Sequence, residues 1–237
     1  MRTAAGVLVL AAALVAGCGP GANPEVVSAP AATLTAEASA DPVVRKLTGA
    51  EWARMVEVGM AGPTCPVKRR NLRRLEINHY DFQGDVKRGA LVVRGDVVAS
   101  VTRIFTALFE QRFPIQRMTP VERFHGSDTK SMAANNTSAY NCRRPSEAHS
   151  PSMKSPHANG RAIDINPIQN PWLNPRTHVW EPSARYRERT EGPGKILERG
   201  LVWRLFNREG WIWQDIATAD YQHFDTGYPS RPFQDRS

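Results

Sequence analysis

The stretch SPHANGRAIDIN, residues 155–166, places a histidine and an aspartate on either side of a glycine. Gly160 allows the backbone to turn between His157 and a strand that carries Asp164. Side chains alternate along a strand, so the isoleucines that flank Asp164 face the core while Asp164 faces the other way. His157 and Asp164 can therefore converge on one ion, although this spacing alone is a weak signal.

A third candidate ligand, His223, lies in the segment DYQHF near the end of the chain. Two histidines and a carboxylate fill three corners of a zinc tetrahedron and leave the fourth for water, which is the composition of an open, catalytic site. The sequence has no HExxH and no CxxC, so neither a helical zinc-protease site nor a cysteine-rich zinc site is predicted. The other histidines are interpreted as surface or packing residues: His79, His125, His149 and His178.

The first residues have the pattern of an export signal. Arg2 is followed by small and apolar residues from 4 to 17, a run too short to cross a bilayer of about 30 Å. The run ends in VAGC, which resembles the lipobox of bacterial lipoproteins. Residues 1–17 are therefore predicted to be a lipoprotein signal peptide and Cys18 the lipidated residue. Acyl chains, at about 0.8 kcal/mol for each buried methylene, would hold the protein on the extracytoplasmic side of a membrane. A plain secretory signal is the alternative.

Export also bears on the remaining cysteines. If Cys18 carries lipid, Cys65 and Cys142 remain as an even pair. In an oxidising compartment, a disulfide between them would close a long loop and contribute about 2–4 kcal/mol to stability. Two buried thiols are the alternative.

The formal net charge of the chain is +8. Outside the cell, this excess of positive charge favours anionic wall polymers and lipid head groups as partners, and nucleic acid is not expected.

The 237 residues suffice for one domain with a core and additional segments. Residues 18–47 are rich in Ala, Pro, Ser, Thr and Glu and cannot bury enough apolar surface to offset ordering, so they predict a flexible tether. The domain is predicted over 48–237. It begins at TGAE, where Thr48 and Glu51 form a capping box for a helix to about residue 60.

Further elements follow from periodicity and turn residues. Strands are predicted at 75–82 and 90–94, and Asp96 is expected to cap a helix whose apolar residues recur at helical spacing. The residues of this face are Val97, Val101, Ile104, Phe105, Leu108 and Phe109. Short extended pieces are expected at 115–118, 137–142 and 162–165, a long loop at 169–193, a helix at 196–208 and two strands near the C-terminus. Because strands and helices do not alternate as βαβ units, the fold class is α+β, with a small antiparallel sheet and flanking helices.

The candidate ligands belong to a longer set of motifs. SPHANGRAIDIN matches SxHxxGxAxD in full, INPIQNP overlaps its end, and GWIW and DYQHF follow. Upstream lie CPV at 65–67, FPIQRM at 113–118 and SDTKSMAANNTSAYNCR at 127–143. Jointly these motifs resemble the zinc D-alanyl-D-alanine carboxypeptidases and related peptidoglycan peptidases of the M15 family, including VanY-like enzymes and L-alanyl-D-glutamate endopeptidases. The resemblance covers about residues 65–224 and implies the DD-peptidase (hedgehog-like) zinc peptidase fold.

The resemblance also implies roles for residues. Zn²⁺ would be held by His157, Asp164 and His223. Asp220 occupies the position of the general base, where many family members have glutamate. Arg143 corresponds to the arginine that contacts a carbonyl or carboxylate of the substrate. The candidate substrate-binding residues are Ser155, Asp128, Ser131 and Trp213, the last because Trp211 and Trp213 alternate on a strand, so that one can face the core and the other the cleft.

The implied function is a lipid-anchored zinc peptidase, expected as a monomer, that hydrolyses peptidoglycan stem peptides. Zinc generates a nucleophile from water near neutral pH, and Asp220 would take its proton. Carboxypeptidase and endopeptidase action remain open. The alternatives are a wall-binding lipoprotein that retains the fold without turnover, and a dipeptidase that acts on free D-Ala-D-Ala.

Overall fold

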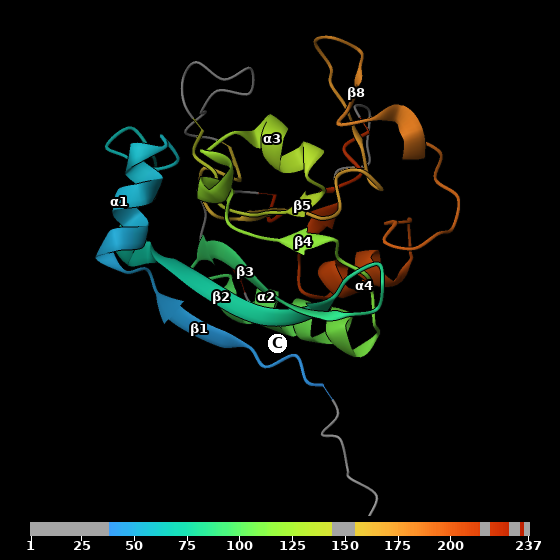
Figure 1. The fold of residues 1–237 in the computed structure, drawn as a ribbon, viewed down its shortest axis with the longest axis horizontal. Helices are drawn as coiled ribbons and strands as arrows, with labels where there is room; N and C mark the ends of the chain where they lie inside the picture. Colours follow the sequence, from blue (N-terminus) through green and yellow to red (C-terminus); the bar gives the residue numbers. More distant parts are fainter. Residues whose placement is uncertain (1–37, 144–154, 214–218, 228–232, 235–237) are drawn as a thin grey trace, which may run out of the picture. The chain divides into compact units, whose positions relative to one another are not determined.

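The computed structural model of the chain describes residues 38–143, 155–213, 219–227 and 233–234. The predicted signal peptide, Cys18 and most of the predicted tether lie outside these residues. Among the helices described, none has both the length and the apolarity to cross a bilayer. The described part combines short helices with small sheets whose strands are antiparallel except for one pair (Figure 1), in agreement with the predicted α+β class.

The larger sheet has the order β1-β2-β3, with β1 at Val43–Lys46, β2 at Leu72–Tyr80 and β3 at Val86–Arg94. β2 and β3 pair along their whole length, from Leu72 opposite Arg94 to Tyr80 opposite Val86. The turn between them contains Gly84, which has a φ of 83°. This hairpin corresponds to the two strands and glycine-containing turn predicted from the sequence.

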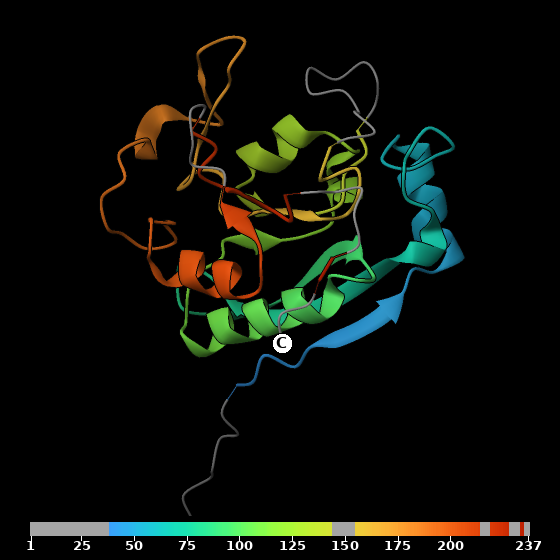
Figure 2. The ribbon, with the colours of Figure 1, turned by 180° about the vertical axis from the view of Figure 1, so that it is seen from behind.

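Helix α2, Val98–Glu110, lies along this sheet (Figures 1 and 2). All six residues of its predicted core face are buried, which confirms the helical periodicity. The predicted cap is wrong, because Val97 occupies the N-cap position without a side-chain hydrogen bond. Asp96 instead forms an ion pair with the buried guanidinium of Arg161.

Helix α1, Gly49–Glu57, begins with the predicted capping box between Thr48 and Glu51. The strand before it was not predicted, because residues 43–46 were assigned to the tether. Their valines are exposed, so apolar burial gives no signal there. β1 is held by backbone pairing with β2 and by Arg45, whose guanidinium nitrogens lie 2.7 and 2.8 Å from Glu51 oxygens and 3.0 Å from Glu76 Oε1.

A second sheet has the order β6-β10-β9 and is antiparallel throughout. Its strands are Ala162–Asp164, His223–Asp225 and Ile212–Trp213. β9 and β10 are the two C-terminal strands predicted from the sequence. The one parallel pair among the described strands joins β4, Arg117–Met118, to β5, Asn136–Thr137. Two short helices lie between β4 and β5 in the chain, η2 at Val121–Phe124 and α3 at Asp128–Ala133, whereas η1, Arg69–Asn71, directly precedes β2 of the larger sheet.

The segment 169–193 is more ordered than predicted. It contains a hairpin of β7, Trp172–Leu173, and β8, Trp180–Glu181, followed by η3, Ala184–Tyr186. The next helix, α4, spans Leu201–Arg208, so the predicted start at residue 196 is wrong. Arg199 has a φ of 58°, which interrupts any helix that would cross it, and Gly200 becomes the N-cap.

Cys65 and Cys142 form a disulfide that joins residues 77 positions apart. Both cysteines are buried in a hydrophobic cluster between α1 and the sheet. The bond therefore ties the segment after α1 to the segment that follows β5, and the predicted pairing is confirmed.

A chain that begins at Thr48 should be less stable than one that begins at Ala38. The shorter chain lacks β1, the buried side chain of Leu47 and the Arg45 contacts, and burial of one leucine contributes about 1.5–3 kcal/mol. The backbone hydrogen bonds between β1 and β2 are lost as well. We therefore expect the free energy of unfolding of the shorter chain to be lower by about 2–4 kcal/mol. Urea denaturation followed by circular dichroism measures the difference, and equal midpoints would show that β1 adds nothing.

Candidate metal centre

The pairing of β6 with β10 brings two of the predicted ligands together. In this antiparallel register, His223 lies directly opposite Asp164. His157 precedes β6 in a tight turn that reverses at Gly160, whose φ is 68°. A Cβ at Gly160 would lie 2.9 Å from the backbone nitrogen of Arg94, so both the turn and its contact with β3 require glycine.

The three side chains are buried, and their ligand atoms lie close together. His157 Nε2 is 3.2 Å from Asp164 Oδ2 and 3.1 Å from His223 Nδ1, and His223 Nδ1 is 2.9 Å from Asp164 Oδ1. Zinc ligands at about 2.0–2.1 Å from a tetrahedral ion are separated by about 3.3 Å. The separations in this chain are close to that value.

The outer ring nitrogens of both histidines have acceptor partners. His157 Nδ1 lies 2.7 Å from the carbonyl oxygen of Ala139, and His223 Nε2 lies 3.1 Å from Asp225 Oδ2. Because these oxygens accept hydrogen bonds, each ring carries a proton on its outer nitrogen. The inner nitrogens are therefore the ones that can supply lone pairs to an ion, together with Asp164, and this arrangement fits a divalent cation with nitrogen and oxygen ligands such as Zn²⁺.

The same proximity shifts the pKa values of Asp164 and His223. Burial opposes ionisation of Asp164, but the neighbouring His157 and His223 outweigh it, so the pKa of this carboxyl is lowered. Burial also disfavours the charged form of His223, yet its hydrogen bonds with Asp164 and Asp225 raise its pKa well above the usual value. The centre therefore attracts positive charge, whether a proton or a metal ion.

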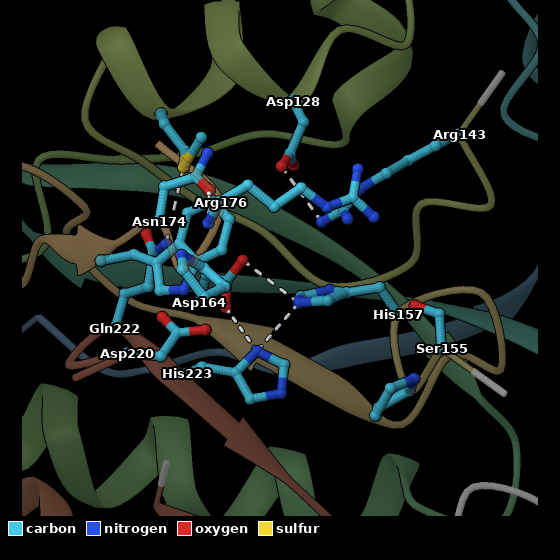
Figure 3. A pocket seen from close by; sticks show the side chains of 14 residues that line it. Asp128, Arg143, Ser155, His157, Asp164, Asn174, Arg176, Asp220, Gln222 and His223 are labelled. Atoms are coloured by element: carbon cyan, nitrogen blue, oxygen red, sulfur yellow. Dashed lines mark hydrogen bonds and ion pairs between the residues drawn. The ribbon is translucent and has the colours of Figure 1, made fainter. Parts of the chain in front are cut away.

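The predicted base, Asp220, lies beside the three ligands (Figure 3). Burial raises the pKa of its carboxyl to about 7. Its position depends on the β7 hairpin, because Trp172 and Asp220 form an antiparallel bridge and the backbone N–H of Leu173 donates to the carbonyl of Ala219 at 3.0 Å.

One cavity of about 390 Å³ contains the three ligands, Asp220 and most of the predicted substrate-binding residues. Asp128 and Arg143 line it and form an ion pair of 3.0 Å. Ser155 also lines it, and its hydroxyl accepts a hydrogen bond from the backbone N–H of Ala158 at 3.4 Å. The other lining residues are Met132, Pro156, Trp172, Asn174, Pro175, Arg176 and Gln222.

Two predicted substrate-binding residues do not line this cavity. Ser131 is buried, and its hydroxyl accepts a hydrogen bond from Asn136 Nδ2 at 2.9 Å. Trp213 is 7% exposed and belongs to the core, because β9 pairs with β10 so that Trp213 lies opposite Phe224, on the face away from His223. The tryptophan that lines the cavity is Trp172.

Several residues of the site were missed in the sequence. Asp225 shares a strand face with His223, and the alternation in HFD was a usable signal for it. Trp172, Asn174 and Arg176 reach the cavity from the β7–β8 hairpin, which the sequence did not predict.

Residues 148–226 match the family model described as D-alanyl-D-alanine carboxypeptidase, which supports a peptidase of the M15 family. The matched segment includes His157, Asp164, Asp220 and His223. Neither the curated proteins nor the solved structures include a significant match to the chain.

Substitution of Asp225 by asparagine should weaken zinc binding by about 10–100-fold, the usual effect of losing an outer partner of a ligating histidine. Asp225 accepts from both His223 Nε2 and the backbone N–H of Gly227, at 3.1 and 2.6 Å. An asparagine can satisfy only one of these donors with its oxygen and turns an N–H toward the other. Competition with a chromophoric chelator measures the affinity.

The matched control for this substitution is Asp85→Asn, at an exposed carboxylate far along the chain from the site. Equal zinc affinities of the Asp225→Asn variant and the control would contradict the role of Asp225.

Proposed function

We propose that this chain is a zinc-dependent peptidase that hydrolyses peptidoglycan stem peptides, as a D-alanyl-D-alanine carboxypeptidase or an L-Ala-D-Glu type endopeptidase. The observation that supports the proposal most is the gathering of His157, Asp164 and His223 in one cavity with Asp220 and Arg143. The family match over residues 148–226 points the same way.

The proposed chemistry is hydrolysis of an amide. His157, Asp164 and His223 would hold the zinc ion, which supplies a Lewis acid and lowers the pKa of water. Asp220 accepts the proton of the attacking water and passes it to the leaving amine. Arg143 places a fixed positive charge beside the carbonyl oxygen as it becomes negative.

The proposal extends to where the protein acts. The signal-like residues 1–17 and Cys18 support export and attachment to a membrane through lipid, which would hold the cavity close to the cell wall. The chain is proposed to act there as a monomer on stem peptides, with no nucleic-acid partner.

Digestion of purified sacculi by the full chain tests the proposed function. Mass spectrometry should detect release of D-Ala or new peptide termini, and a chelator should abolish it. Binding of sacculi without any release, by protein that carries zinc, would contradict a peptidase and favour a wall-binding role.

An Asp220→Asn variant should retain zinc but lose at least about 100-fold in the rate of hydrolysis. The carboxylate is not one of the three ligands, and general bases contribute about 10²–10⁴-fold to rate. Zinc content is measured by atomic spectroscopy and rate by release of the product amine. Asp85→Asn serves again as control, and a rate within a few-fold of this control would show that Asp220 is not the base.

A further inference from the structure

Two arginines reach the cavity from different parts of the chain. Arg143 follows the disulfide-bonded Cys142, and Arg176 lies in the turn between β7 and β8. In Figure 3 their side chains enter from opposite sides. Among the described residues that line the cavity, these two carry the permanent positive charges.

Both arginines are held in the same way. Each is the third residue of an Asn-x-Arg sequence, NCR at 141–143 and NPR at 174–176. The backbone N–H of Arg143 donates to Asn141 Oδ1 at 3.1 Å, and that of Arg176 donates to Asn174 Oδ1 at 2.9 Å. Both asparagines are buried, at 2% and 5% exposure. The two turns thus fix the backbone from which each guanidinium extends.

The turn that carries Arg176 has further support. Asn174 Nδ2 donates to Glu181 Oε1 at 2.7 Å. The backbone N–H of Asn174 donates to the carbonyl oxygen of Val179 at 3.0 Å, and the backbone N–H of His178 donates to the carbonyl oxygen of Asn174 at 2.8 Å. The tip of the hairpin is therefore a closed, hydrogen-bonded turn, which fixes the backbone from which the exposed residue Arg176 extends.

The charge in the cavity is divided between two ends. Asp164 and Asp220 lie with the histidines, whereas the guanidinium groups extend toward Asp128 (Figure 3). Asp128 lies at this end and pairs with Arg143 at 3.0 Å. A guanidinium matches a carboxylate in shape and charge and can bind it through two parallel hydrogen bonds.

We propose that Arg176 binds a carboxylate of the peptide substrate near the scissile bond, beside the carbonyl oxygen that Arg143 faces, and that Arg176 determines specificity for this carboxylate. This inference rests on the proposed peptidase function. The carboxylate belongs either to the C-terminus of the peptide or to the side chain of an acidic residue.

Kinetics with three forms of one stem peptide test the site: the free acid, the C-terminal amide, and the form with its acidic side chain converted to an amide. The unmodified chain should hydrolyse the free acid best. Arg176→Met should lower kcat/KM for the free acid by about 10–100-fold, the effect of losing a hydrogen-bonded charge. For the amide that lacks the recognised carboxylate, the change should be within about 2-fold, and this identifies which carboxylate is bound.

Arg187→Met is the matched control, because Arg187 lies on the same segment, is exposed, and pairs with Glu188 outside the cavity. Arg176→Lys should retain part of the preference, since lysine keeps the charge but not the planar fork. An equal loss for all three peptides in Arg176→Met, or no loss for any, would overturn the proposal.

Binding measured without turnover separates this site from the proposed function. Calorimetry with the zinc-loaded Asp220→Asn variant should show tighter binding of the free acid than of the relevant amide, and Arg176→Met in that background should abolish the difference. If binding discriminates while the unmodified chain hydrolyses nothing, the carboxylate site stands and the peptidase function fails. Hydrolysis without such discrimination would overturn the carboxylate site alone.

Discussion

In the sheet formed by β6, β10 and β9, His223 is paired across the strands with Asp164. Directly opposed residues have Cβ atoms about 4.5–5.5 Å apart, which is close enough for their side chains to share an ion. A shift of one residue would turn His223 to the core and Phe224 to the cavity. Phe224 is stacked on Phe206 of α4 with 4.0 Å between ring centroids. Packing of Phe224 on the core face therefore fixes the register that assembles the site on the other face.

An isolated antiparallel bridge to β6 orients the third ligand. Ser138 and Asp164 exchange backbone hydrogen bonds of 3.0 and 2.9 Å, and this places the next carbonyl, that of Ala139, against His157 Nδ1. Three groups with lone pairs are thus held within hydrogen-bonding distance of one another by the surrounding core. In the absence of a metal ion, a proton on His223 Nδ1 forms the hydrogen bond with Asp164, so the centre is preorganised for a cation.

Sequence reasoning succeeded where local rules determine the outcome. The apolar period of α2, the capping box of α1 and the alternation around Asp164 each depend on neighbours within a few residues. β1 was missed because ion pairs of Arg45 and pairing with β2 stabilise it, with little apolar burial. Trp213 was misplaced because the register between β9 and β10 decides its face, and periodicity within one strand cannot give that register.

The segment 169–193 was misjudged for a related reason, since its order comes from contacts distant in the chain. The half-buried guanidinium of Arg189 donates to the carbonyls of Gln169 and Ile196, at 3.2 and 2.9 Å, and so closes the segment on itself. It also lies 4.3 Å from the ring centroid of Tyr221, the residue after Asp220. A pattern rich in Pro, Arg and Glu does not reveal such a closure.

The ordered segment connects Arg176 with Asp220, two residues of the site that lie far apart in the sequence. The β7–β8 hairpin carries Arg176 at its turn, and its first strand forms the bridge with Asp220. Trp180 of β8 stacks on Tyr221, with 5.6 Å between ring centroids, so the hairpin contacts the residue next to the base on a second side. A change in the length of this segment would therefore move the base together with the wall of the cavity. The proposed base and the proposed specificity residue therefore depend on one structural element, whereas the candidate metal ligands depend on the register of β6 and β10.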